Sequence, residues 1–213
     1  MSRAEIPPAT VRELEEFEEY HEIPEELRPE LMLEDYLALP VTNRRLEVID
    51  GVIVMSPSPT GWHQKLLIRF HRGIDDFVTP RGLGEVFVSP LDILIRKLPK
   101  LRVRQPDVAF FAALELAGLD LRRVNVWEVV PQIVVEITSP SDRAKKWAAK
   151  LADYASIRVP EVWRADPDAE SIEVLALAEG RYTRAGLFGA GDAVRSIVLP
   201  GLELPVGPLF AAR

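Results

Sequence analysis

The apolar run inside QIVVEIT (132–138) constrains the fold of this chain more than any other segment. Four of its seven residues are Ile or Val, and such a short run is typical of a strand buried on both faces of a sheet. Glu136 lies inside this run. A carboxylate in so apolar a strand is expected to be partly buried, and a buried charge requires a counter-ion or a metal ion. An ion pair with an arginine is the purely structural interpretation of Glu136.

A basic amphipathic helix is predicted directly after this strand, in SDRAKKWAAKLADYA (141–155). At about 100° per residue, Lys150 lies about 40° from Tyr154, at the edge of the apolar face, so its ammonium can reach back to the sheet. Lys146 lies further round the helix and is expected to meet solvent or a phosphate. A surface lysine whose stem covers apolar surface is the structural interpretation of Lys150. The apolar face itself consists of Trp147, Leu151, Tyr154 and Ala155.

The other segments predict a mixed sheet with helices packed on it. Asp50–Gly51, between alternating apolar residues, predicts a tight hairpin turn within 44–58. Apolar residues at helical spacing predict a long helix within 58–78. This order of elements favours an α/β fold with a central mixed β-sheet flanked by helices and with extra C-terminal β-strands. Further expected elements are a short helix within 33–40 and strands at 84–89, 91–97, 106–111, 161–166, 171–177, 181–188 and 193–200.

The net charge of −7 argues at first against a nucleic-acid partner, because nucleic-acid-binding proteins are usually basic. However, 12 of the 33 acidic residues and only 3 of the 26 basic residues lie within 1–35, which leaves 21 acidic and 23 basic residues in a nearly neutral body. Within that body, RKLPKLRVR (96–104) has five basic residues and no acidic one. Solvated surface is the other interpretation of such a run. We therefore expect an acidic N-terminal extension (1–32) before a single domain (33–213).

The absence of cysteine narrows the possible chemistry. It excludes disulfides, thiol nucleophiles and cysteine-bound metals, and it is compatible with a reducing compartment. The first twenty residues lack the apolar core of a signal peptide, and no apolar run approaches the length of a membrane span. We expect a cytoplasmic protein that does not cross a membrane.

Three further side chains are candidates for a functional site. Asp107 begins a strand directly after a proline, where a carboxylate is often only a turn or cap residue. Glu47 precedes the hairpin turn and alternates with Leu46 and Val48, so it faces the opposite side of the strand. His63 lies near the start of the long helix, where a histidine serves as a cap, a metal neighbour or a general acid or base.

Several ordered motifs together resemble a known family. They are LEVIDGVIVMSPSPTGWH (46–63), QPDVAFF (105–111) and VVEITSPSDRAKKWAAKLADYASIRVPEVWRADP (134–167). In this order they are similar to the Uma-two family of restriction-endonuclease-like proteins, within the PD-(D/E)XK nuclease superfamily. The resemblance covers about residues 33–175 and implies a restriction-endonuclease-like fold that is often dimeric.

The resemblance also implies a set of site residues. Asp107 and Glu136 match the two acidic residues of the motif, and Glu47 matches the acid before the tight turn. His63 matches the histidine that opens the first long helix, and Lys150 matches the lysine in the following helix. These matches place residues from three separate segments of the sequence in one expected site.

One position departs from the superfamily pattern. That pattern places a lysine two residues after the strand glutamate, on the same strand face, and this chain has Thr138 there. Either Lys150 reaches the site from the helix or the chain lacks a catalytic lysine. Arg143 is a poorer candidate because an arginine does not release a proton.

Metal-dependent hydrolysis of DNA is the function that these residues and the resemblance suggest. Asp107, Glu136 and the Ile137 backbone carbonyl are expected to bind Mg²⁺ or Mn²⁺, with Glu47 as an added ligand. Lys150 is expected to orient the attacking water or to stabilise the charge of the transition state. The residues expected to contact the DNA backbone are Arg102, Arg104 and Lys146.

Two other classes of function stay open. The chain could be a catalytically inactive nuclease-fold protein that acts as a dimeric binding or regulatory module, because fold does not fix function. The absent strand lysine and the acidic net charge favour this alternative. A metal-dependent hydrolase of a small phosphate substrate is the third class.

Overall fold

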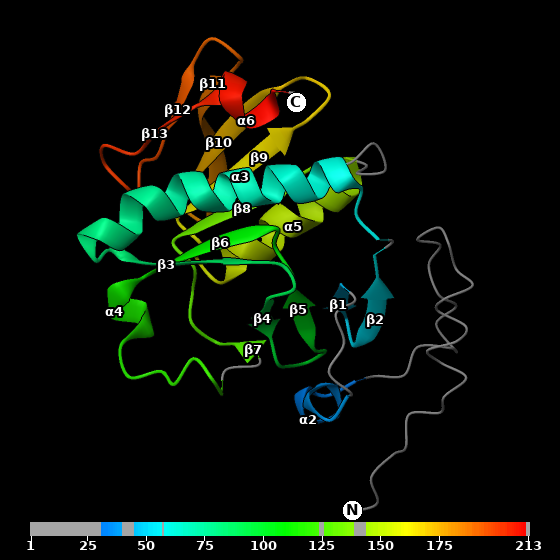
Figure 1. The fold of residues 1–213 in the computed structure, drawn as a ribbon. Coiled ribbons are helices and arrows are strands. Elements are labelled where there is room, and N and C mark those ends of the chain that lie inside the picture. The colour runs from blue at the N-terminus through cyan, green and yellow to red at the C-terminus, as the bar shows by residue number, and fades with distance from the viewer. Residues whose placement is uncertain (1–30, 40–44, 57, 124–125, 139–143, 212–213) are drawn as a thin grey trace, which may run out of the picture.

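A six-stranded mixed β-sheet forms the centre of the computed structural model, which describes residues 31–39, 45–56, 58–123, 126–138 and 144–211 (Figure 1). Its strand order is β11-β10-β9-β8-β6-β3. Strands β8 and β9 run parallel, and the other neighbouring pairs run antiparallel. The strands are β3 (Gly84–Val88), β6 (Val108–Ala112), β8 (Ile133–Ile137), β9 (Glu161–Asp166), β10 (Ser171–Ala178) and β11 (Arg181–Phe188).

Helix α3 (Gly61–Val78) covers one face of this sheet (Figure 1). Its buried residues recur at helical spacing, and Phe70 and Ile74 are fully buried in the largest apolar cluster. Thr60 caps the helix, because its hydroxyl accepts a hydrogen bond from the backbone N–H of His63 at 3.2 Å. The cap fixes where the helix begins and therefore where the His63 side chain lies.

Helix α5 (Ala144–Ser156) packs on the opposite face of the sheet. Its Tyr154 is fully buried against Val134 of β8, whereas the alternate residues of β8 belong to the core on the α3 side. Side chains alternate along a strand, so Glu136 shares the α5 face with Val134. The apolar strand thus turns its single acid toward a helix and not toward solvent.

A second, five-stranded sheet has the order β2-β1-β5-β4-β7 and lies below the first sheet in Figure 1. The β1–β2 hairpin turns at Asp50 and Gly51, whose φ angles of 52° and 81° lie in the left-handed region that glycine adopts without strain. Tyr36 of helix α2 (Leu33–Leu37) packs against this sheet. The strands are β1 (Leu46–Ile49), β2 (Val52–Met55), β4 (Asp92–Arg96), β5 (Arg102–Arg104) and β7 (Val126–Trp127).

An apolar seam joins the two sheets. Ile93 and Trp127 of the second sheet share one buried cluster with Ala109 and Phe111 of β6. The Phe111 and Trp127 rings lie 4.7 Å apart between centroids. This packing fixes the position of the second sheet relative to the first.

The C-terminal segment packs on the α3 side of the main sheet. Glu161, fully buried at the start of β9, accepts hydrogen bonds from the backbone N–H groups of Ile197 and Val198 at 2.7 and 2.9 Å. The Ser196 hydroxyl donates to the same carboxylate at 3.2 Å. The remaining elements are η2 (Thr79–Arg81), α4 (Ala113–Leu116), β12 (Ala193–Arg195), β13 (Glu203–Pro205) and α6 (Val206–Phe210).

The predicted fold class is confirmed, since a central mixed sheet carries helices on both faces and extra strands at its C-terminal end. Some segments differ from expectation, among them the following two. Residues 102–104 form strand β5 inside the second sheet, and the expected strand 193–200 ends at Arg195 because the next residues turn to bind Glu161. The predicted extension (1–32) lies outside the described residues except for its last two. No helix in the described ranges has both the length and the apolar character needed to cross a bilayer.

Replacement of Phe70 by alanine should lower the free energy of unfolding by about 3–5 kcal/mol, because it leaves a cavity between α3 and the sheet. Replacement of Ile68 on the same helix, which is 53% exposed, should change it by no more than about 0.5 kcal/mol. Urea unfolding followed by tryptophan fluorescence measures both values. Equal losses in the two variants would show that α3 does not pack through its Phe70 face.

Candidate active site

Asp107 lies just before β6 and is almost completely buried, with 1% of its surface exposed. Its carboxylate accepts hydrogen bonds from Arg45 at 2.7 Å, from His63 Nε2 at 3.1 Å and from the backbone N–H of Ile137 at 2.7 Å. A carboxylate only accepts in such contacts, so His63 carries a proton on Nε2. The contact with Ile137 ties Asp107 to the end of β8, the strand that carries Glu136.

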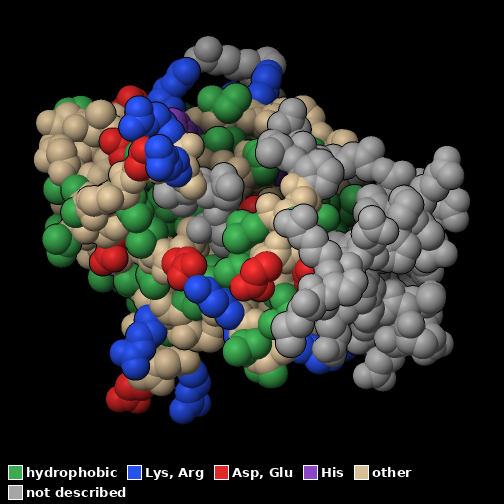
Figure 2. Space-filling view, turned by 90° about the horizontal axis from the view of Figure 1, so that it is seen from below, with side chains coloured by type: hydrophobic (Ala, Val, Ile, Leu, Met, Phe, Trp, Pro, Cys, Tyr) green, Lys and Arg blue, Asp and Glu red, His purple; other side chains and the backbone are tan. Residues whose placement is uncertain are grey.

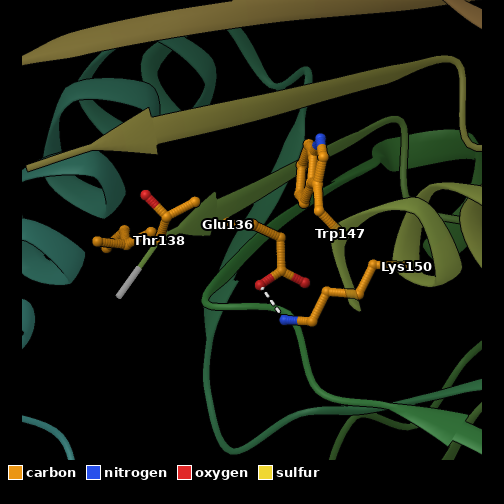
Figure 3. A pocket seen from close by; sticks show the side chains of 5 residues that line it. Glu136, Thr138, Trp147 and Lys150 are labelled. Atoms are coloured by element: carbon orange, nitrogen blue, oxygen red, sulfur yellow. Dashed lines mark hydrogen bonds and ion pairs between the residues drawn. The ribbon is translucent and has the colours of Figure 1, made fainter. Parts of the chain in front are cut away.

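Glu136 projects from β8 toward α5 (Figure 3). Its Oε2 accepts from Lys150 Nζ at 2.7 Å, and its Oε1 accepts from the Tyr154 hydroxyl at 2.5 Å. Lys150 and Tyr154 stand four residues apart, so one face of the helix supplies both donors. Beside the carboxylate lies a small hollow, partly open to solvent, with room for about one water molecule. It is lined by Glu136, Ile137, Thr138, Trp147 and Lys150.

Arg45 bridges the two carboxylates. Its Nη1 lies 2.7 Å from Asp107 Oδ1, and its Nη2 lies 3.8 Å from Glu136 Oε2. Nη2 also donates to the backbone carbonyl of Gln105. Because Arg45 stands directly before β1, the second sheet delivers a cation between two acids that the first sheet holds. Sequence reasoning missed this residue, since its partner Asp107 lies 62 positions away and no local pattern links the two.

A second group of ion pairs adjoins the first. Glu47, buried on β1, accepts from Arg104 at 2.8 Å and from the backbone N–H of Gln105 at 3.2 Å. Arg104 also pairs with Asp153 of α5 at 2.6 Å, and Arg102 pairs with the same Asp153 at 2.8 Å. These contacts connect the second sheet to the helix that carries Lys150.

The positions of Arg102 and Arg104 differ from the solvated basic surface that their sequence run suggested. Arg104 is buried, and its guanidinium is used by two carboxylates that need its charge. The expected contact of these two arginines with DNA stays a prediction.

The charges at the site shift its pKa values in opposite directions. Burial raises the pKa of Asp107, but Arg45 and then His63 outweigh it and hold this pKa at about 2. Burial raises the pKa of Glu136 above its ordinary value, and the negative Asp107 adds to this rise although Lys150 opposes it. For Glu47, Lys150, Arg104 and Arg45 outweigh the effect of burial and lower the pKa. Glu136 is thus the acid whose ionised form gains most from another cation.

The structure shows which side chains lie near Glu136 in place of the strand lysine of the superfamily pattern. Thr138 donates its hydroxyl to the Ala165 carbonyl at 3.1 Å, and the ammonium beside Glu136 comes from Lys150 on the helix. Lys146 lies half-buried on the same helix. Arg143 lies outside the described residues. The structure therefore brings Asp107, Glu136, Glu47, His63 and Lys150 into one neighbourhood, as predicted, and their chemical roles stay predictions.

The two acids suit a hard divalent ion. Carboxylate and carbonyl oxygens are the ligands that Mg²⁺ and Mn²⁺ prefer. Among the described residues, no group of three His, Asp or Glu side chains is arranged to hold a metal. Asp107 and Glu136 nevertheless fit such an ion, because they already share one cation, the Arg45 guanidinium. An ion here would be held by two carboxylates and backbone, not by three acidic side chains.

Comparison with known proteins identifies the family and the fold of this chain. The Uma2 family, described as "Putative restriction endonuclease", matches residues 33–207. The chain belongs to the Uma2 family. The predicted Uma-two resemblance is therefore confirmed. Among solved structures, this Uma2 protein is similar to a "putative nuclease belonging to DUF820" from Anabaena variabilis ATCC 29413, with a TM-score of 0.70 and 22% sequence identity. The match covers 84% of this chain and 97% of the other, which supports a shared, restriction-endonuclease-like fold. No protein of curated function matches the chain.

Replacement of Arg104 by methionine should destabilise the Uma2 fold by about 3–5 kcal/mol, because it leaves the buried Glu47 and Asp153 without a shared counter-ion. Arg195, in an exposed pair with Glu203 at 2.9 Å, provides the matched control and should cost less than about 1 kcal/mol. Denaturant unfolding measures both. A small loss for Arg104→Met would mean that water already screens this pair.

The pH dependence of stability should carry the signature of Asp107. Its folded pKa of about 2 lies below the ordinary 3.8, so its contribution is fully present above about pH 4 and is lost as pH falls toward 2. The difference in unfolding free energy between wild type and Asp107→Asn should therefore be largest near neutral pH and shrink in acid. Urea unfolding at several pH values measures it, and a difference that stays constant down to pH 2 contradicts the ion pair.

Proposed function

We propose that this Uma2 protein is a metal-dependent endonuclease that hydrolyses phosphodiester bonds in DNA, with Mg²⁺ or Mn²⁺ as its ion. The observation that carries the proposal is the convergence of Asp107 and Glu136 on one cation, with the Lys150 ammonium 2.7 Å from Glu136. Paired carboxylates beside a cation are the groups used for metal-assisted attack of water on a phosphate. Membership of the Uma2 family supports the same chemistry.

Asp107, Glu136 and the Ile137 carbonyl are the proposed ligands of the ion. When bound, that ion supplies Lewis acidity and lowers the pKa of a coordinated water. The protein's own residues orient the two carboxylates. His63 and the Ile137 N–H fix the Asp107 carboxylate at 3.1 and 2.7 Å, and the Tyr154 hydroxyl fixes Glu136 at 2.5 Å. Neighbours that hold the ligands in this way commonly decide metal affinity and activity.

Lys150 is the proposed source of positive charge at the reacting phosphate. Burial lowers the pKa of Lys150, but the negative charges of Glu136 and Glu47 raise it by more. The pKa therefore lies above its ordinary value. The side chain is therefore protonated at neutral pH and can orient a water or stabilise the charge that develops on the phosphate. Glu47 helps to hold this ammonium in its charged form.

The charge pattern of the surface bears on how DNA would bind. On the face seen in Figure 2, acidic and basic side chains of the described residues are interspersed. Lys146 of α5 is the proposed contact with the DNA backbone, and affinity should fall with rising salt as phosphate contacts are screened. A homodimer is the assembly that we propose for this activity, on the basis of the family resemblance. A cytoplasmic location is proposed from the lack of cysteine and of a signal-peptide core in the first twenty residues.

The test is cleavage of supercoiled plasmid DNA with Mg²⁺ or Mn²⁺. Asp107→Asn and Glu136→Gln should abolish metal-dependent cleavage, because each removes a ligand charge. Lys150→Met should slow cleavage by a factor on the order of 10²–10³, the usual loss for one donor at a developing charge. Calorimetry with the same ions should show binding that depends on Asp107 and Glu136.

Two matched substitutions control for charge alone. Cleavage should be unchanged in Asp75→Asn and in Lys97→Met. Asp75 of α3 accepts a hydrogen bond from the Thr79 hydroxyl, and Lys97 forms an exposed ion pair with Glu128. Unaltered cleavage in the Asp107 and Glu136 variants would reject the site. Ion binding without cleavage of DNA would favour the inactive binding module or a small phosphate substrate.

A further inference from the structure

We propose that Arg45 is a positioning residue that occupies, in the metal-free protein, the place that the divalent ion takes in the active protein. This inference rests on the proposed function. The Arg45 guanidinium lies 2.7 Å from Asp107 Oδ1 and 3.8 Å from Glu136 Oε2, the two carboxylates proposed as metal ligands. Arg45 is thus the resident cation of the site.

The guanidinium and a divalent ion cannot share these oxygens. Mg²⁺ binds carboxylate oxygens at about 2.0–2.1 Å and uses their lone pairs. Asp107 Oδ1 already accepts from both Arg45 and His63. A second cation in the same buried space would also repel the guanidinium strongly, because little water is present to screen the two charges. Entry of the ion therefore requires Arg45 to move away.

Arg45 can leave the site while the acids stay in place. Its side chain is 19% exposed, and moving outward would give up its contacts with Asp107, Glu136 and the Gln105 carbonyl. The same movement would expose to water its buried Nε, which has no hydrogen-bond partner within the described part of the chain. Arg45 stands directly before β1, so rotation about its side-chain bonds can carry the guanidinium outward without disturbing the strand. Asp107 keeps the contacts with His63 and the Ile137 N–H, and Glu136 keeps those with α5.

Arg45 has two opposed effects on ion binding. It holds two like-charged carboxylates together when no metal is present, which preserves the geometry of the site. It also competes with the ion, because its contacts with Asp107 and Glu136 must be given up on binding. The competition raises the ion concentration that the site requires, and it favours divalent over monovalent ions, since a single charge gains little by replacing a guanidinium.

Titration calorimetry of the full chain with Mn²⁺ tests the competition. Arg45→Gln should bind Mn²⁺ about tenfold more tightly or better than wild type, because the competing charge is gone. Arg45→Lys keeps that charge and should bind close to wild type. Arg184→Gln is the matched control, since it also loses one positive charge, from a pair with Glu173 at 2.6 Å on β11, and its affinity should not change.

Displacement itself can be observed in protein labelled with ¹⁵N-arginine. The Arg45 Nε–H signal, assigned by its loss in Arg45→Lys, should shift when Mg²⁺ saturates the wild-type protein. This observation carries the test if Arg45→Gln does not fold. Mg²⁺ binding that depends on Asp107 but leaves the signal and the Mn²⁺ affinities unchanged would overturn the inference and leave the proposed function standing. Absence of ion binding in both wild type and Arg45→Gln would overturn both.

Discussion

Burial of negative charge where two sheets meet is the constraint on which the rest of the structure depends. Asp107, Glu136 and Glu47 are all buried, and a buried carboxylate is stable only with a partner. The partners come from three elements: Arg45 before β1, Arg104 on β5 and Lys150 on α5. Each element must dock in one position to place its cation, so charge balance selects a single arrangement of sheets and helix. The apolar core supplies most of the driving force, and the ion pairs specify the geometry.

Helix α5 connects the two groups of ion pairs. Its Lys150 and Tyr154 hold Glu136, and its Asp153 holds Arg102 and Arg104 of the second sheet. These three helix residues lie within a little more than one turn. A displacement of the helix would therefore alter the charge at Glu136 and the anchoring of the second sheet together. A site of this kind couples its electrostatics to the packing of its largest elements.

The sequence predicts those parts of the structure that depend on local periodicity. The apolar strand around Glu136, the hairpin at Asp50 and the angular position of Lys150 on its helix all follow from patterns a few residues long. The role of Arg45 in the site cannot be predicted from such patterns, because its partner Asp107 lies 62 residues away in the sequence. Arg104 is expected from the sequence to contact the DNA backbone, with solvated surface as the other interpretation of its basic run, and only strand pairing reveals the acids beside it.

The apolar seam between the sheets has a consequence for the chemistry, although it contains none of the charged groups. Ile93, Trp127 and Phe111 act as a spacer that sets how far the second sheet stands from the first. Arg45 and Glu47 lie on or directly before a strand of the second sheet, while Asp107 and Glu136 lie on or directly before strands of the first. The volume of a few apolar side chains therefore tunes the distance between cation and carboxylate, so the strength of the site can be adjusted from the core without any change in its charged residues.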